Sequence, residues 1–175
     1  MAYLSPAEFV TKMVDTGEAK IHMSTRDTLI RAFMAGAILA LAAVFAVSAS
    51  VMSGSALIGA LLFPVGVCML YLLGFDLLTG VFMLTPLALL DKRPGVTVRG
   101  ILRNWGLVFV GNFLGALTVA GMMAFIFTYG FSVPPGEIGQ KIGHIGEART
   151  LGYAEYGLMG WATISLRGVL CNWMV

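Results

Sequence analysis

Charge is scarce along this chain. Asp, Glu, Lys and Arg together make up 11% of the 175 residues, whereas soluble domains carry about 25%. Apolar residues make up 58%, and the mean hydropathy is +0.89. This composition excludes an ordinary soluble domain and predicts a membrane protein, and the apolar segments described below predict that it is all-α and integral to the membrane. Glycine is abundant by contrast, with 22 residues, which suits helices that pack closely in lipid.

Cysteines and catalytic groupings are also scarce. Cys68 and Cys171 both lie in apolar runs, and their spacing indicates neither a disulfide nor a zinc site. No nucleophile, base and orienting group occur together, so we expect no enzymatic activity and no cofactor. The net charge of +2 says little about partners, and we expect no nucleic acid among them.

Apolar residues gather in four segments after a polar N-terminal stretch. We predict a cytoplasmic N-terminal amphipathic helix and linker over residues 1–31 and a transmembrane domain over 32–175. The predicted spans are 32–52, 56–90, 105–129 and 157–175, the last of them incomplete.

The second apolar segment is interrupted by the polar sequence 74–80. A continuous helix over these roughly 35 residues would be about 52 Å long, but the hydrocarbon core is only about 30 Å thick. Two crossings would need about 40 apolar residues. We therefore predict one crossing made of two half-helices. Irregular backbone at that depth survives only where protein or a water-filled cavity covers it, which indicates a transport pathway.

The distribution of basic residues predicts the orientation. They are concentrated before the first span and between the second and third, whereas the 53–55 turn is uncharged and the 131–152 loop carries balanced charge. The N-terminus is therefore expected in the cytoplasm, provided that 56–90 crosses once. The basic residues on the cytoplasmic side are Lys12, Lys20, Arg26, Arg31, Lys92, Arg93, Arg99 and Arg103.

Two local patterns predict how helices begin and pack. Ser5 to Glu8 is a capping-box pattern, and it opens a short amphipathic helix that we expect to end near Gly17. This helix could lie on the membrane surface, but packing against its own bundle is favoured because its polar side is poor in Lys and Arg. The G-x-x-x-G of 111–115 indicates helix packing. Asn112 within it needs a partner in lipid, and we expect the backbone of 74–80.

The chain resembles the formate/nitrite transporter family. The resemblance follows the chain in order, and the matching segments are 5–8, 63–66, 74–79, 103–105, 111–115 and 166–175. It implies an aquaporin-like helical bundle with a broken second span, built from inverted repeats, of which this chain holds the first and part of the second. It also implies a homopentamer in the bacterial inner membrane, with a pore in each protomer.

The resemblance implies roles for several residues. Thr79 would face the pore, and the apolar constrictions would be formed by Leu77, Leu78, Val67 and Val175. Asn172 would join Asp76 and Asn112 in supporting the interrupted segment. The family's vestibule lysine is not matched, because Tyr156 aligns there. Arg149 or Lys141 could replace it.

Two charged residues in the spans keep alternative readings. Asp76 could be a functional carboxylate, but we favour a cap on the backbone N–H of Leu78 or Thr79. Arg167 either reaches a lipid headgroup or attracts anions into the outer vestibule, along with Arg149.

These features predict passage of a small monovalent anion such as formate or nitrite, with or without a proton. The positive dipole end of the half-helix near Leu78 favours an anion, whereas leucine constrictions disfavour a bare charge. An aquaporin-type channel for water or neutral solutes is the alternative, weakened by the missing Asn-Pro-Ala motif. A membrane scaffold without a pore would not need the interruption.

Histidine is restricted to polar segments. His22 and His144 lie outside the predicted spans, so neither can serve as the pore histidine that the family carries on its fifth span. A carboxylate ending the chain at Val175 would lie in or near hydrocarbon, where charge is expensive. We therefore expect the sequence to be part of a longer protein.

Overall fold

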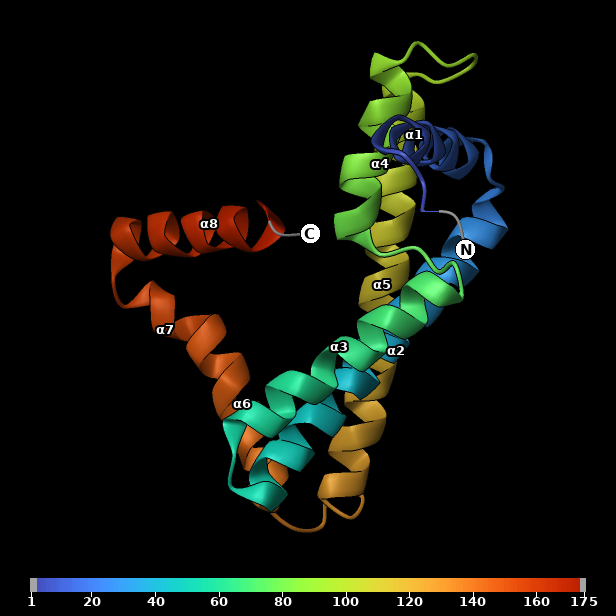
Figure 1. Ribbon diagram of the computed structural model, residues 1–175. Helices are drawn as coiled ribbons and strands as arrows, with labels where there is room; N and C mark the ends of the chain where they lie inside the picture. The colour runs from blue at the N-terminus through green and yellow to red at the C-terminus, as the bar shows by residue number, and fades with distance from the viewer. Residues whose placement is uncertain (1–2, 174–175) are drawn as a thin grey trace. The chain divides into compact units, whose positions relative to one another are not determined.

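The computed structural model describes residues 3–173, except the side chain of Asn172. Its regular elements in that range are all α-helices, and Figure 1 shows their arrangement. They are α1 (Pro6–His22), α2 (Thr25–Ser53), α3 (Ala56–Leu72), α4 (Leu78–Leu90), α5 (Val98–Phe127), α6 (Glu137–Arg149), α7 (Leu151–Ala154) and α8 (Gly157–Trp173).

Two helices, α2 and α5, are long and apolar enough to cross a membrane, whereas α3, α4 and the apolar part of α8 are shorter. Both long helices begin seven residues before the predicted spans, at Thr25 and Val98. At the start of α2, the Ser24 hydroxyl accepts from the backbone N–H of Asp27 at 3.0 Å. The helix therefore begins at a polar cap and not at the first apolar residue.

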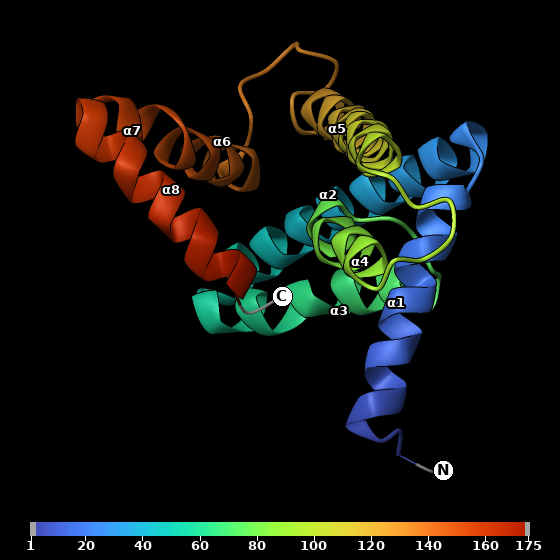
Figure 2. The same cartoon turned by 90° about the horizontal axis from the view of Figure 1, so that it is seen from above.

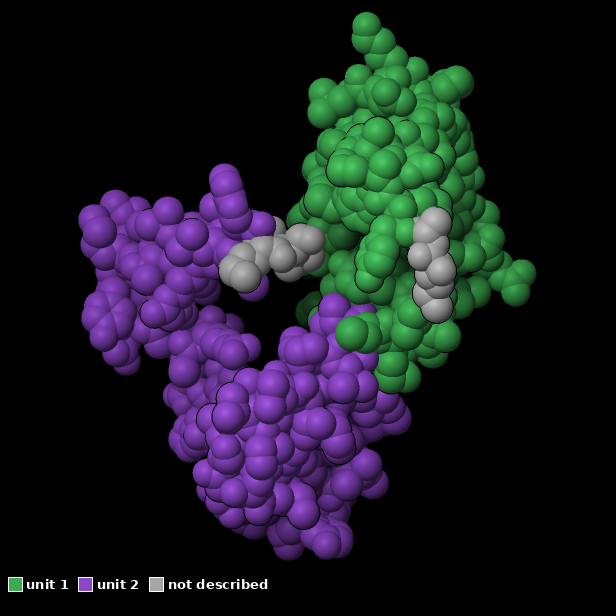
Figure 3. Space-filling view, viewed as in Figure 1, with its two compact units in different colours: residues 1–39, 68–118 green, residues 40–67, 119–175 purple. Residues whose placement is uncertain are grey.

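The chain divides into two compact units, coloured separately in Figure 3. Unit 1 comprises residues 1–39 and 68–118, and unit 2 comprises residues 40–67 and 119–175. Helices α2, α3 and α5 each contribute residues to both.

Within unit 1, α1 packs on α4, as can be followed in Figure 2. The predicted capping box is present, since the Glu8 carboxylate accepts from the Ser5 backbone N–H at 2.7 Å and the Ser5 hydroxyl accepts from Glu8 N–H. The prediction that the helix ends near Gly17 is wrong. Gly17 is instead buried within the helix, at a point where a Cβ would collide with the backbone of Leu84. The glycine permits close packing, and α1 continues to His22.

Ion pairs also hold α1 in unit 1. The Arg93 guanidinium, in the α4–α5 turn, lies 2.7 Å from the Asp15 carboxylate and 3.5 Å from that of Glu18. The second half of α1 thus packs against its own bundle, as the favoured alternative predicted. Phe9 and Val10 in the first half are more than half exposed.

Helices α2 and α5 approach closely in unit 1 at three glycines. A Cβ on Gly111 would meet Ala32, one on Gly115 would meet the carbonyl of Phe33, and one on Gly36 would meet the backbone of Asn112. The predicted packing role of the G-x-x-x-G motif is confirmed.

Unit 2 contains two helices where the sequence predicted only a loop over 131–152. Helix α6 follows the extended residue Gly136. Glu137 lies in its first turn and Arg149 in its last, so both charges complement the helix dipole. Helix α7 is a short continuation that leads into α8 (Figure 1). The balanced charges therefore belong to a helix and not to an irregular loop.

Candidate functional site

The helical interruption lies between Leu72, where α3 ends, and Leu78, where α4 begins. Gly74 has φ +70°, which side chains other than glycine rarely adopt. The N–H groups of Gly74 and Phe75 donate to the carbonyls of Tyr71 and Leu70 and so complete the end of α3. The non-helical segment 73–77 is thus shorter than the predicted 74–80.

Asn112 on α5 bonds to this segment from the side. Its side-chain oxygen accepts from the backbone N–H of Leu78 at 2.9 Å, and its amide donates to the carbonyls of Asp76 and Ala32, each at 2.8 Å. These bonds satisfy backbone groups that neither half-helix can pair internally. The predicted partnership between Asn112 and the interrupted segment is confirmed.

Asp76 does not cap α4. Helix α4 has no side-chain cap at Leu77, and Asn112 holds the N–H of Leu78. The Asp76 carboxylate instead forms a buried ion pair with the ammonium group of Lys20 on α1. A charged partner 56 residues away in sequence compensates a buried carboxylate better than one neutral N–H, which explains the difference from the predicted cap.

Two cationic side chains approach the carbonyl of Gly74 in the same turn. The Lys20 ammonium lies 3.5 Å and the Arg31 guanidinium 3.3 Å from the Gly74 carbonyl. Asn104 on α5 donates to the Lys20 carbonyl at 3.1 Å. One Asp76 carboxylate oxygen, Oδ2, is buried and has no hydrogen-bond partner within the described part of the chain. It therefore has room to accept one further hydrogen bond.

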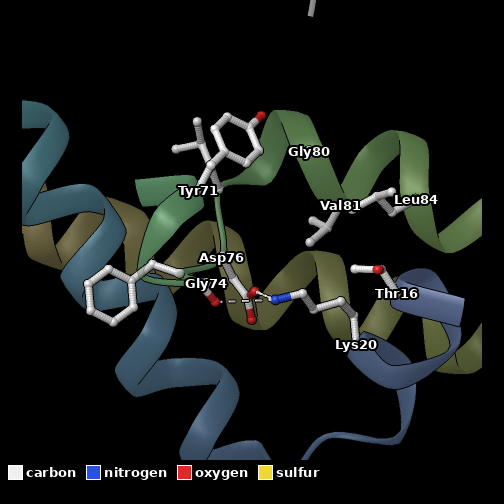
Figure 4. Close-up of a pocket in the computed structure, with 10 residues that line it drawn as sticks. Thr16, Lys20, Tyr71, Gly74, Asp76, Gly80, Val81 and Leu84 are labelled. Atoms are coloured by element: carbon white, nitrogen blue, oxygen red, sulfur yellow. Dashed lines mark hydrogen bonds and ion pairs between the residues drawn. The ribbon is translucent and has the colours of Figure 1, made fainter. Parts of the chain in front are cut away.

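A pocket of about 140 Å³ lies against the ion pair. Figure 4 shows the Lys20 and Asp76 side chains pointing toward each other between α1 and the interrupted segment. The pocket is lined by Thr16, Lys20, Tyr71, Gly74, Phe75, Asp76, Leu77, Gly80, Val81 and Leu84.

The predicted pore residues Leu77, Leu78 and Thr79 lie together in unit 1, and all three are half-buried. Leu77 precedes α4 and lines the pocket, whereas Leu78 packs on the buried cluster around Val81. Within residues 3–173, the Thr79 hydroxyl forms no hydrogen bond, unlike that of Thr85, which donates to the Val81 carbonyl at 2.8 Å.

The other predicted residues are not brought to this site by unit 1. Val67, Arg149 and Arg167 belong to unit 2, on α3, α6 and α8. Arg149 is exposed, and Arg167 bonds to Tyr153. Val175 and the Asn172 side chain lie outside the described residues.

Sequence reasoning missed Lys20, Arg31 and Asn104. The sequence pattern identifies Lys20 and Arg31 only as cytoplasmic basic residues. The sequence does hold a signal for Lys20, which is adjacent to Ile21 and three residues from Gly17 and so lies near one face of α1. The structure shows that both of these residues are buried. Asn104 lies between Arg103 and Trp105, and it is fully buried.

The long apolar helices α2 and α5 and the interrupted apolar stretch are consistent with a helical membrane transporter. The family model for formate/nitrite transporters matches residues 7–175. The chain belongs to the formate/nitrite transporter family.

Several curated relatives are similar over the whole chain. An uncharacterised transporter of Bacillus subtilis is 30% identical over 100% of this chain and 64% of its own length. A probable formate transporter of Methanothermobacter thermautotrophicus is 29% identical over 99% and 67%, and a formate channel of Bacillus thuringiensis is 28% identical over 100% and 65%. The chain spans about two thirds of the length of these relatives. No solved structure matches it significantly.

Proposed function

We propose that this chain forms part of a channel or transporter for small monovalent anions such as formate or nitrite. The 56–90 segment would cross the membrane once as a broken span, with the interruption beside the pore. Two relatives named as formate transporter or formate channel, together with family membership, support this substrate class.

The observation that carries the proposal is the start of α4 in the interrupted apolar stretch, with Thr79 in its first turn. A helix N-terminus presents a positive dipole end, which favours an anion. The Thr79 hydroxyl has no hydrogen-bond partner among the described residues, so it is free to donate to a permeating anion.

The charges around the segment support the same substrate. Lys20 neutralises Asp76, so the carboxylate does not present a net charge that would repel an anion. Leu77 and Leu78 would narrow the passage together with Val67 and Val175, and passage of the anion with a proton would lower the cost of crossing these apolar constrictions. Asn112 and Asn172 would support the interrupted segment, and Arg149 and Arg167 would attract anions to the outer vestibule.

The proposed setting is a homopentamer in the bacterial inner membrane with a cytoplasmic N-terminus. Membrane lipid is then a constant partner of the apolar helix faces. These faces are extensive, since many large apolar side chains of α2, α3, α5 and α8 are exposed in the single chain.

The test is anion flux into proteoliposomes that contain the complete natural protein. Thr79→Val keeps the side-chain shape but removes the donor, so formate or nitrite flux should fall or change its pH dependence while the oligomer stays intact. Thr79→Ser keeps the hydroxyl and should be milder. Flux and pH profile identical in Thr79→Val, Thr79→Ser and the parent would remove Thr79 from permeation. Rapid water flux without anion flux would favour the aquaporin-like alternative.

A further inference from the structure

Helix α8 carries one charged side chain, Arg167, in an otherwise uncharged sequence. A cation on such a helix needs a counter-charge or other polar partners, because isolated charge is costly in a membrane. Among the residues that the structure describes, no carboxylate lies within ion-pair distance of Arg167. Its positive charge is therefore not neutralised within this part of the chain.

The Arg167 guanidinium is nevertheless held in place. It donates to the Tyr153 hydroxyl, and its central carbon lies 5.6 Å from the centre of the Tyr153 ring. Gly160 allows the approach of α7 to α8, since a Cβ there would collide with the Tyr153 carbonyl. The Tyr153 bond uses one of the five N–H donors of Arg167.

A pocket of about 380 Å³ lies beside these two side chains, within unit 2. Tyr156 and Thr163 also line it. The Thr163 hydroxyl donates to the Met159 carbonyl at 2.7 Å, so the donors left for a ligand come from Arg167 and the two tyrosines. The pocket thus combines one fixed cation with neutral hydroxyl groups.

We propose that the pocket between α7 and α8 binds a small oxyanion through Arg167, with Tyr153 holding the guanidinium in position. The planar guanidinium fork matches carboxylate and phosphate oxygens in a bidentate manner. The ligand is either a free carboxylate or the phosphodiester of a lipid headgroup, which share this chemistry. The free carboxylate as ligand rests on the proposed function, since the pocket would then bind the transported anion before it enters the pore.

Protection of Arg167 from modification by phenylglyoxal tests the site, with the rate at each arginine measured by mass spectrometry. The protein is held in dodecyl maltoside, which has no phosphate. One arm compares sodium formate with sodium chloride at equal ionic strength. The other compares micelles with and without phosphatidylglycerol. Arg99 serves as the matched control, because it is exposed and lies in the other unit.

At a ligand concentration of about twice Kd, modification of Arg167 should slow about threefold, because the free fraction falls as 1/(1 + [L]/Kd). Arg99 should be unaffected. Protection in the formate arm identifies a free carboxylate, and protection in the lipid arm identifies a headgroup phosphate. Tyr153→Phe keeps the ring but removes the hydroxyl, and it should weaken the protection. No protection in either arm, equal protection of Arg99, or full protection in Tyr153→Phe would overturn the proposal.

The result is separable from the proposed function because it measures binding and not flux. A protein that transports formate with Arg167 unprotected in both arms would lack this site but keep its function. A protein with a protected Arg167 and no anion flux would keep the site and lack the function.

Discussion

Lys20 and Asp76 form an ion pair that is almost sealed from solvent, with 12% and 0% of their side chains exposed. Taking both charges out of water is costly, and the pair compensates only while both partners are present. The ion pair joins α1 to the non-helical segment between α3 and α4. Its loss should therefore affect stability and the shape of that segment together.

Lys20→Met should lower the free energy of unfolding by about 3–5 kcal/mol, because it leaves a buried carboxylate without its partner. Lys20→Met combined with Asp76→Leu should lose less than Lys20→Met alone, since no buried charge remains. Unfolding in mixed micelles of dodecyl maltoside and sodium dodecyl sulfate measures both. If the loss in the double variant equalled the sum of the losses measured for Lys20→Met and Asp76→Leu separately, the two side chains would not interact.

Glu8 gives a pH dependence to the start of α1. The backbone N–H of Ser5 and then the Ser5 hydroxyl lower the pKa of the Glu8 carboxyl below its ordinary value. The stabilisation is therefore present above the ordinary pKa and is lost as the pH falls through the lowered one. Amide hydrogen exchange in the first turn of α1 should accelerate across that acidic window. Glu8→Gln should remove the acceleration, and an unchanged profile in that variant would contradict the assignment.

Residues with one unusual local feature were predictable, whereas residues paired across the fold were not. Asn112 stood out because an amide in an apolar helix must find a partner, and the nearest unpaired backbone was evident. Lys20 looked like any other cytoplasmic lysine, because nothing in its neighbourhood indicates Asp76. The cap predicted for Asp76 was wrong for the same reason: local reasoning offers only local partners.

At the scale of elements, the glycines of α5 differ in what surrounds them. Gly115 lies against the backbone of Phe33 on α2, whereas no described residue comes within 4 Å of a Cβ added at Gly106 on the same helix. Gly115→Ala should destabilise by about 1–3 kcal/mol, because backbone must move. Gly106→Ala should be neutral or stabilise by up to about 1 kcal/mol through helix propensity.

The same unfolding assay in mixed micelles compares these two variants. Equal effects of Gly115→Ala and Gly106→Ala would mean that α2 and α5 do not approach at Gly115.

The boundaries of the interruption illustrate the limit of prediction for elements. Gly74 marks the end of α3, as its sequence context indicates. Gly80 looked like a second breaker, but Asn112 accepts from the N–H of Leu78, so α4 begins before that glycine. A helix start set by a side chain on another helix cannot be located from the local sequence. The helices α6 and α7 were missed because their sequence is neither strongly apolar nor free of glycine.

At the scale of the whole molecule, the distribution of basic residues predicts how the chain is oriented in the membrane. Cysteines placed singly at Arg99 and at Glu137, in a variant with Cys68 and Cys171 replaced by serine, should react from opposite sides of the membrane. Arg99→Cys should react only from the cytoplasm and Glu137→Cys only from outside. Reaction of both from one side would contradict a single crossing by residues 56–90.

The central claim is that Thr79 lies in an aqueous anion pathway, and an anionic thiol reagent tests it directly in the complete protein. Thr79→Cys, without Cys68 and Cys171, should react with a sulfonated methanethiosulfonate, formate should slow the reaction, and the modification should block formate flux. The control is Thr85→Cys on the same helix, where the native side chain is 0% exposed, and it should stay unmodified. A Thr79→Cys variant that does not react, or that reacts without loss of formate flux, would contradict the account.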